Sequence, residues 1–359
     1  MITNRVFSQA SSWIPSLPYV FVYSDEFPNE SIKQINNQFP HANISFVEIK
    51  NRSEHIIGSQ WTNPWYRAQP RFLPAMHDLW KQNPHVRWYI VCDDDTYLYN
   101  QNILRRLGKH NSSNPEVISF FWCTWNYITE YMKPERDCHP FAQGGSGVIF
   151  SKTMMDLIGP KLIECSEKYN DAEHAASMRV SVCMEREFGY ENWTKGGFIK
   201  PWKSGIHPSN PSVVISQGNT WDSPGSFHQV SPEEMVNLKK SHLVWLDDGF
   251  IDFSYFAFRS VPVELTRRRW WQLHFGYRID NFASHSNQLM VLTSFEPIEY
   301  GKNNEIKTFQ QVYQGNVTVF VHCNNNYEDF QIDVDEVERG PATKIHVSLK
   351  CPKKQKYYK

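Results

Sequence analysis

The feature that most constrains the fold of this chain is an apolar strand that runs directly into three aspartates. Residues 87–92 read RWYIVC, and Asp93, Asp94 and Asp95 follow at once. A short, mainly apolar run of this length is typical of a strand buried in a sheet. Adjacent carboxylates repel each other and raise each other's pKa, so a row of three is costly without a cation. The pattern predicts a buried sheet with a metal site at the end of one strand.

Carboxylate oxygens suit Mn²⁺ or Mg²⁺, and an ion held there can bridge a diphosphate. His228 is a candidate further ligand, because neutral imidazole binds Mn²⁺ well. The alternative is a solvated acidic turn, with His228 an ordinary member of the 14 histidines. The strand before the aspartates and the Thr96-Tyr97 pair after them favour the metal site.

Strands and helices alternate through the first half of the chain. Expected strands cover residues 18–25, 44–49, 87–92, 117–122 and 148–150, and expected helices cover 30–38, 67–81, 151–165 and 174–188. This alternation predicts an α/β core with a mostly parallel sheet. Ligands of such sheets bind at the carboxyl ends of the strands, which is where the three aspartates stand. Residues 203–225, rich in Gly, Pro, Ser and Asn, are expected to form a long loop.

The pattern changes after about residue 262. Residues 288–295, 316–323, 330–334 and 344–351 alternate as strands, with no expected helix between them. We therefore divide the chain into a domain at 1–262 and a small β-rich C-terminal region at 263–359. Residues after about 275 carry no clustered carboxylates, and we expect no catalytic group from them.

Two weaker patterns are compatible with a phosphate-binding site. Arg67 and Arg71 lie four residues apart on one expected helix, so they share a face, and one or both could hold diphosphate oxygens. A surface arginine pair accounts for them equally well. Gly144 and Gly145 begin a GGSG segment that lets a ligand approach the backbone closely, although a plain tight turn explains it too.

The charge balance bears on partners. The chain has 37 basic and 38 acidic residues, and its formal net charge is −1. Nucleic acid and anionic membranes both favour a basic surplus, so neither is an expected partner. Aromatic residues reach 15%, including 13 Trp, which fits either a Trp-rich core or carbohydrate binding.

The seven cysteines indicate an oxidising compartment. None lies in a CxxC pair of the zinc type, and six fall into local pairs in sequence order while Cys92 is left over. Two disulfides, Cys123–Cys138 and Cys323–Cys351, are expected from proximity. Seven buried free thiols in a cytosolic protein are the alternative. Six Asn-X-Ser/Thr sequons add modest support for a secreted glycoprotein. The first 18 residues hold no apolar stretch of signal-peptide or transmembrane length, so a targeting segment is missing from this chain.

Three motifs together resemble a known family. They are WYIVCDDDTY at 88–97, FAQGGSGVIFSK at 141–152 and SFH at 226–228. In order and spacing they are similar to the fringe-like β-1,3-glycosyltransferases, which include fringe and the core 1 galactosyltransferases. RVSVCM at 179–184 and RRRWW at 267–271 resemble the plant and fungal branch that has a C-terminal extension. The resemblance covers about residues 18–275, and the joint pattern is specific.

The resemblance implies a Rossmann-like core of the glycosyltransferase A type. It also implies an inverting hexosyltransferase that uses a UDP-sugar donor and Mn²⁺ or Mg²⁺, with a glycan or glycoprotein acceptor. Such enzymes are type II membrane proteins of the Golgi or endoplasmic reticulum lumen. The membrane anchor expected for the family is absent from this chain.

The resemblance also assigns residues. Asp95 and His228, joined by Asp93, would hold the metal. Asp93 and Asp94 would lie by the ribose and the donor sugar, and Gly144 and Gly145 would line that sugar.

Further assignments concern the nucleotide end of the site and one disulfide. Ser24 and Asp25 would lie near the uridine at the end of the first strand. Arg67 would face the diphosphate. Cys165 and Cys183 match a family disulfide.

One departure from the family concerns the catalytic base. The family has a carboxylate two residues before Arg179, where this chain has Ser177. An inverting displacement needs a group that accepts the proton of the acceptor hydroxyl, and serine does this poorly. Asp171 or Glu173 would serve instead, or the alignment slips locally. The alternative function is a catalytically disabled member that binds glycans or assists a partner enzyme.

Overall fold

The structure is a computed structural model. It describes residues 2–49, 65, 68–124, 139–169, 175–194, 196–202, 205–211, 224–246, 249–252, 260–266, 269–275, 290–300, 306–316, 318–323, 328–333 and 344–349. The chain divides into two compact units. The first unit comprises residues 1–98, 104–208 and 226–229, and the second comprises residues 99–103, 209–225 and 230–359. The division that we expect at residue 262 stays a prediction.

An N-terminal layer opens the first unit, beginning with a helix that the sequence patterns did not predict. Helix α1 (Ile2–Ser11) precedes strand β1 (Val20–Ser24), helix α2 (Asn29–Gln38) and strand β2 (Ile44–Glu48). Strands β1 and β2 pair in parallel. Val6 and Ala10, four apart on α1, are buried in a cluster with Ile35 of α2. This packing explains how so short a helix is stabilised.

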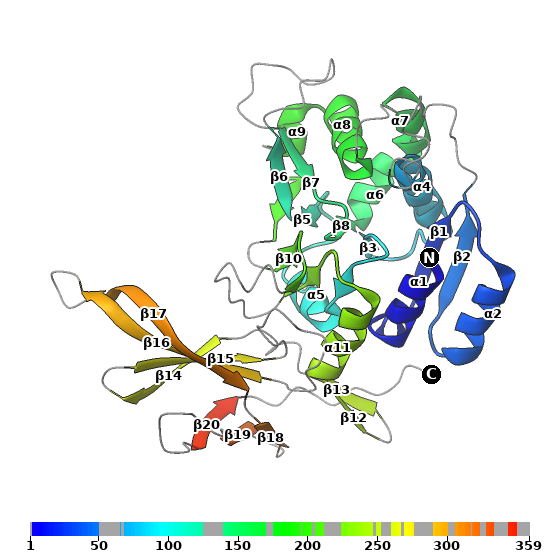
Figure 1. Cartoon of the computed structure of the whole chain (residues 1–359). Helices are drawn as coiled ribbons and strands as arrows, with labels where there is room; N and C mark the ends of the chain where they lie inside the picture. Colours follow the sequence, from blue (N-terminus) through cyan, green and yellow to red (C-terminus); the bar gives the residue numbers. More distant parts are fainter. Residues whose placement is uncertain are drawn as a thin grey trace. The chain divides into compact units, whose positions relative to one another are not determined.

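A four-stranded sheet forms the centre of the first unit (Figure 1). Its order is β3 (Trp88–Val91), β8 (Val148–Ser151), β5 (Val117–Ser119) and β9 (Ile199–Pro201). Strand β8 runs antiparallel to both neighbours, and β5 pairs with β9 in parallel. Three of the four strands therefore point the same way, and the predicted α/β core is confirmed.

Shorter strands form a second, three-stranded sheet in this unit. Strand β11 (Ser226–Phe227) pairs in parallel with β10 (Ile206–His207) and antiparallel with β4 (Tyr97–Leu98). Strand β10 lies inside the segment that we expected to be a loop. The run predicted as one strand at 117–122 is divided, because β6 (Phe121–Thr124) leaves β5 to pair with β7 (His139–Ala142).

Helices cover the central sheet. The expected helix at 67–81 begins with a 3₁₀ turn (Gln69–Arg71) and continues as α4 (Phe72–Gln82). Pro74 lies in its first turn, where the missing N–H has no intrahelical acceptor to lose. The expected helix at 174–188 is α8 (Ala176–Phe188). Helix α5 (Asn100–Leu107) follows β4, and α9 (Tyr190–Thr194) follows α8.

The prediction of a single helix at 151–165 is wrong. The structure has α6 (Lys152–Ile158), a 3₁₀ turn (Gly159–Lys161) and α7 (Leu162–Lys168) in its place. Pro160 has no N–H to donate, so it breaks the helix. Gly159 also lies against the indole of Trp80, where an added Cβ would stand 2.4 Å from the ring.

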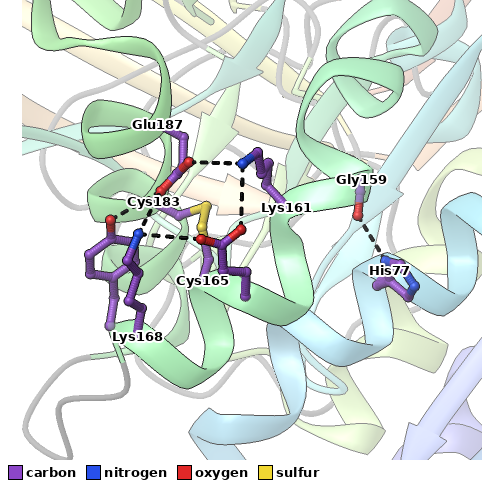
Figure 2. The surroundings of a disulfide bond; sticks show 9 residues. His77, Gly159, Lys161, Cys165, Lys168, Cys183 and Glu187 are labelled. Carbon is purple, nitrogen blue, oxygen red and sulfur yellow. Dashed lines mark hydrogen bonds and ion pairs between the residues drawn. A yellow bond between two sulfur atoms is a disulfide. The ribbon is translucent and has the colours of Figure 1, made fainter.

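A disulfide joins two helices of this layer, as the family resemblance implied. Cys165 of α7 is bonded to Cys183 of α8, and neither side chain is exposed. Figure 2 shows the ion pairs nearby, in which Lys161 and Lys168 both contact Glu187. Cys92 carries a free thiol, and burial raises its pKa well above the usual range. The other two expected disulfides involve cysteines whose side chains lie outside the described residues.

The second unit contains helix α11 (Pro232–His242) and strands. Strands β12 (Leu243–Leu246) and β13 (Gly249–Asp252) pair antiparallel. An antiparallel sheet joins β14 (Ser260–Thr266), β15 (Arg269–Phe275), β16 (Met290–Tyr300) and β17 (Ile306–Asn316) in that order. A three-stranded sheet joins β18 (Thr318–Cys323), β19 (Glu328–Asp333) and β20 (Lys344–Leu349). The predicted β-rich C-terminal region is confirmed. In the part of the chain that is described, no helix is long and apolar enough to span a bilayer.

Candidate metal and donor site

The three aspartates form a turn between two strands. Strand β3 ends at Val91, and the chain turns through the aspartates into β4 at Tyr97. Thr96 is fully buried, and its hydroxyl donates to the carbonyl of Gly145. This bond ties the acidic turn to the glycine-rich segment, so two of the sequence motifs lie side by side.

The third motif reaches the same place through the short sheet. Strand β11 ends at Phe227, and the N–H of His228 donates to the carbonyl of His207 at 3.1 Å. Gln229 follows with a positive φ of 58°. Because β11 pairs with β4, His228 is brought back to the acidic turn across more than 130 residues of sequence.

Asp93, Asp95 and His228 form a cluster with the geometry of a metal site. One potential ligand atom from each lies within 4.8 Å of the others. His228 Nε2 is 3.2 Å from Asp95 Oδ1 and 3.7 Å from Asp93 Oδ2. Asp95 Oδ1 is buried, and its contact with His228 Nε2 does not have the geometry of a hydrogen bond, so no described residue donates a well-formed hydrogen bond to it. A buried carboxylate oxygen in this condition is what a cation ligand requires, so the residues fit a divalent ion.

The other ring nitrogen of His228 supports the same interpretation. Nδ1 lies 3.2 Å from the carbonyl oxygen of Pro208, which can only accept a hydrogen bond. The contact therefore places a proton on Nδ1 and leaves Nε2 to face the aspartates. A metal-binding histidine commonly donates its second N–H to a backbone carbonyl in this way. Gln143 Nε2, which is also a donor, lies farther from Nδ1, at 3.5 Å, and Gln143 Oε1 accepts from the N–H of Ser146, so the nearer carbonyl of Pro208 is the acceptor for Nδ1.

Charge dominates the cluster. Burial lowers the pKa of His228, but the two facing carboxylates outweigh it and raise that pKa to about 10. Burial raises the pKa of Asp95, yet the contact with His228 reverses the sign and leaves that pKa below its usual range. The imidazolium thus balances the carboxylates. A divalent cation would bring the same compensation and displace the proton from Nε2.

The two glycines allow close approach, each to a different group. A Cβ added at Gly145 would lie 2.3 Å from His228 Nε2, so any side chain there would displace the histidine. A Cβ at Gly144 would lie 3.1 Å from the Cβ of Ser177. Gly147 has a φ of 104°, which favours glycine. The GGSG segment is therefore more than a tight turn, because it packs against the candidate ligand.

The predicted nucleotide residues gather at the end of β1. Arg71 Nη1 lies 3.4 Å from Asp25 Oδ2 and 3.5 Å from the hydroxyl of Ser24. Asp25 Oδ1 is buried and has no hydrogen-bond partner among the described residues. Arg71 contacts Ser24 at the end of β1 and Asp25 just after it, and its side chain is mostly buried, which is not typical of a surface arginine. Arg67 lies outside the described residues.

Sequence reasoning missed the contribution of α1. Arg5 Nη1 donates to Asp94 Oδ1 at 2.6 Å, and Gln9 Nε2 lies 3.4 Å from the backbone oxygen of Asp93. Trp13 Nε1 donates to the backbone oxygen of Thr96 at 3.1 Å. Arg5, Gln9 and Trp13 follow each other at intervals of four, which is the signal that a helical face points at one target.

Ser177 is buried at the start of α8, beside Gly144. The position at which we expect the family carboxylate is therefore next to the glycine segment. The N–H of Ala176 donates to Gln69 Oε1 at 2.8 Å, which holds this helix end. Asp171 and Glu173 lie outside the described residues, so their role as the base stays a prediction.

Comparison with known families assigns this α/β core to a class of enzymes. The Fringe-like family model matches residues 17–198, which is half of the chain. The chain therefore belongs to the Fringe-like family, a family of glycosyltransferases. A search of curated protein sequences found no match.

Proposed function

We propose that this protein is an inverting glycosyltransferase that moves a hexose or N-acetylhexosamine from a UDP-sugar to a hydroxyl of a glycan or glycoprotein. The observation that carries the proposal is the cluster of Asp93, Asp95 and His228, in which a buried oxygen of Asp95 faces His228 Nε2 and accepts no well-formed hydrogen bond from the described residues. Family membership supports the transferase class. The cluster supports dependence on a divalent ion, Mn²⁺ or Mg²⁺.

Each part of the site has a task in this proposal. Asp95 and His228, together with Asp93, would hold the cation, which would stabilise the charge that develops on the leaving UDP. Gly144 and Gly145 would leave room for the donor sugar against the backbone. The acceptor hydroxyl then attacks the anomeric carbon, the bond to UDP breaks, and a base takes the hydroxyl proton.

The end of β1 supports nucleoside binding. Ser24, Asp25 and Arg71 meet there, and Asp25 keeps a buried oxygen to which no described residue donates a hydrogen bond. A ribose or uracil N–H or O–H would satisfy this oxygen. Arg67, outside the described residues, remains our candidate for a diphosphate contact.

Location in the secretory pathway, in the Golgi or endoplasmic reticulum lumen, is part of the proposal. Family membership supports it, and so does the bonded pair Cys165–Cys183, because disulfides persist in oxidising compartments. A membrane anchor is expected for the family.

A second function is favoured by one observation. Ser177, not a carboxylate, stands beside Gly144. A chain that binds a sugar nucleotide without a base would act as a glycan-binding or accessory protein.

The deciding experiment measures UDP release from a panel of UDP-sugars with Mn²⁺, with and without simple acceptor sugars. Release that requires both Mn²⁺ and an acceptor supports the enzyme. Metal-dependent UDP binding without release for any pair favours the accessory protein, and no UDP binding at all contradicts both.

A further inference from the structure

Helix α1 precedes the residues that the family model matches, yet it contacts the acidic turn directly. Arg5 Nη1 lies 2.6 Å from Asp94 Oδ1 and 3.7 Å from Asp95 Oδ2. The contacts of Gln9 and Trp13 with the backbone of the same turn fix the orientation of the helix. The contacts of Gln9 and Trp13, four and eight residues after Arg5, therefore help to hold the Arg5 guanidinium next to Asp95, a candidate metal ligand.

Within the described part of the chain, the guanidinium of Arg5 uses only some of its N–H donors in hydrogen bonds. Its side chain is 40% exposed, and its one hydrogen bond within the described part of the chain goes to Asp94. A guanidinium carries five N–H donors in a planar fork, so most of them remain for another acceptor. A purely structural arginine at a half-buried carboxylate such as Asp94 would more commonly use the fork in a bidentate pair.

The position also restricts what that acceptor is. Metal–oxygen distances are about 2 Å, so a phosphate oxygen that shares a cation with Asp95 lies within a few ångströms of this carboxylate. The Arg5 guanidinium already reaches the same carboxylate. The arginine fork matches phosphate oxygens as well as carboxylates, so a phosphate beside the cation is a suitable acceptor.

We propose that Arg5 binds the diphosphate of the nucleotide donor beside the cation, and that its contact with Asp94 keeps this carboxylate from the cation. The inference rests on the proposed function and deepens it. It makes α1 part of the donor site, although the helix lies outside the family match.

The proposal predicts that loss of the Arg5 charge weakens UDP binding but does not weaken Mn²⁺ binding. A positive charge near the cation repels it, so removing the charge should not weaken Mn²⁺ binding on its own. The same change removes a charged partner of the diphosphate, so it should weaken UDP binding. A residue that merely supported the fold would weaken both.

The experiment is calorimetry of the full chain with Mn²⁺ alone, and with UDP at saturating Mn²⁺. Arg5→Met should raise the Kd for UDP about tenfold, the effect of one charged hydrogen bond. The Kd for Mn²⁺ should stay equal or fall. Arg5→Gln, which keeps a donor for Asp94, should show the same pattern and serves if the first variant does not fold. Arg5→Lys should weaken UDP binding less.

Arg87→Met is the matched control. Arg87 is exposed at the opposite end of β3, about 20 Å along the chain from the aspartates. The Arg87→Met variant should bind UDP and Mn²⁺ with the same affinities as the unmodified protein.

Three outcomes would overturn the inference. If the unmodified protein shows no metal-dependent UDP binding, the proposed function falls together with it. If that protein binds but Arg5→Met and Arg5→Gln bind equally well, only the role of Arg5 falls. If these variants lose Mn²⁺ and UDP affinity in parallel, Arg5 is structural.

Discussion

Gly145 and His228 are packed so closely that a single methyl group at Gly145 would occupy the position of the histidine ring. The added Cβ would lie 2.3 Å from Nε2 and 2.4 Å from Cε1. No rotation of a methyl group relieves such a contact, so His228 would have to move away from Asp95.

Gly145→Ala is therefore expected to weaken Mn²⁺-dependent UDP binding about 10–100-fold, the usual cost of disturbing the support of a metal ligand. Calorimetry measures it. Gly108→Ala is the matched control, because its Cβ would make ordinary contacts of 3.4 and 3.6 Å with two carbonyl oxygens. Equal UDP affinity of Gly145→Ala and the unmodified protein would show that His228 is no ligand.

Asp95 is expected to be the carboxylate on which metal dependence rests. Asp95→Asn should lower UDP affinity in Mn²⁺ to the value that the unmodified protein shows in EDTA. The variant should stay folded with a modest loss of stability, because the contacts with His228 and Arg5 outweigh burial and hold the pKa of Asp95 below its usual range. Asp156→Asn, at an exposed carboxylate of α6, is the control. If EDTA does not lower the UDP affinity of the unmodified protein, the site does not use a metal ion to bind UDP.

The Cys165–Cys183 disulfide should contribute about 3 kcal/mol to the free energy of unfolding, because it closes a loop of 18 residues between buried positions. Denaturant unfolding of Cys165→Ala/Cys183→Ala measures the loss. Glu164→Gln, which removes exposed ion pairs with Lys161 and Lys168, should leave stability essentially unchanged. A double variant as stable as the unmodified protein would mean that the bond is not formed.

His207 should make stability depend on pH. Its ring is buried and stacked on Phe227 at 5.0 Å, and burial lowers its pKa to about 3 from 6.5. The folded state keeps the ring neutral while the unfolded chain takes up a proton below pH 6.5. The contribution of the neutral ring to stability is thus complete above 6.5 and is lost as the pH falls toward 3.

Unfolding free energies at pH 7 and 4.5 test this. The unmodified protein should lose about 2–3 kcal/mol more over that interval than His207→Phe, which keeps the ring volume without titrating. The same loss in both proteins would show that His207 is protonated in the folded state or lies near solvent.

Local patterns predicted the site, and tertiary contacts explain what they missed. The strand that ends in Asp93, Asp94 and Asp95 has a strong apolar signal, and its cost without a cation predicts a metal ion there. His228 was one candidate ligand among 14 histidines, and only the family resemblance assigned it to the metal. Strands β4, β10 and β11 have two residues each, too few for any periodicity to appear. The sheet that brings His228 to the aspartates was therefore not predictable from pattern.

Two other differences had signals that the sequence contains. Gly159-Pro160 is a helix-breaking pair that should have divided the helix predicted at 151–165. Arg5, Gln9 and Trp13 have helical spacing, but α1 is only ten residues long. A helix of that length depends on tertiary packing, here of Val6 and Ala10, so propensity alone could not establish it.

The last prediction concerns the base. The attacking hydroxyl needs a proton acceptor within about 3 Å, directly or through one water. Ser177 stands beside Gly144 but has no affinity for a proton near neutral pH. We expect Asp171, six residues earlier, to serve ahead of Glu173, because a carboxylate near the start of α8 is made less basic by the helix dipole. Asp171→Asn should abolish sugar transfer and leave UDP binding intact, with Glu173→Gln as the parallel test. If neither change affects transfer and Ser177→Asp creates or greatly raises it, then the chain is a disabled transferase, and its sugar-nucleotide site serves binding alone.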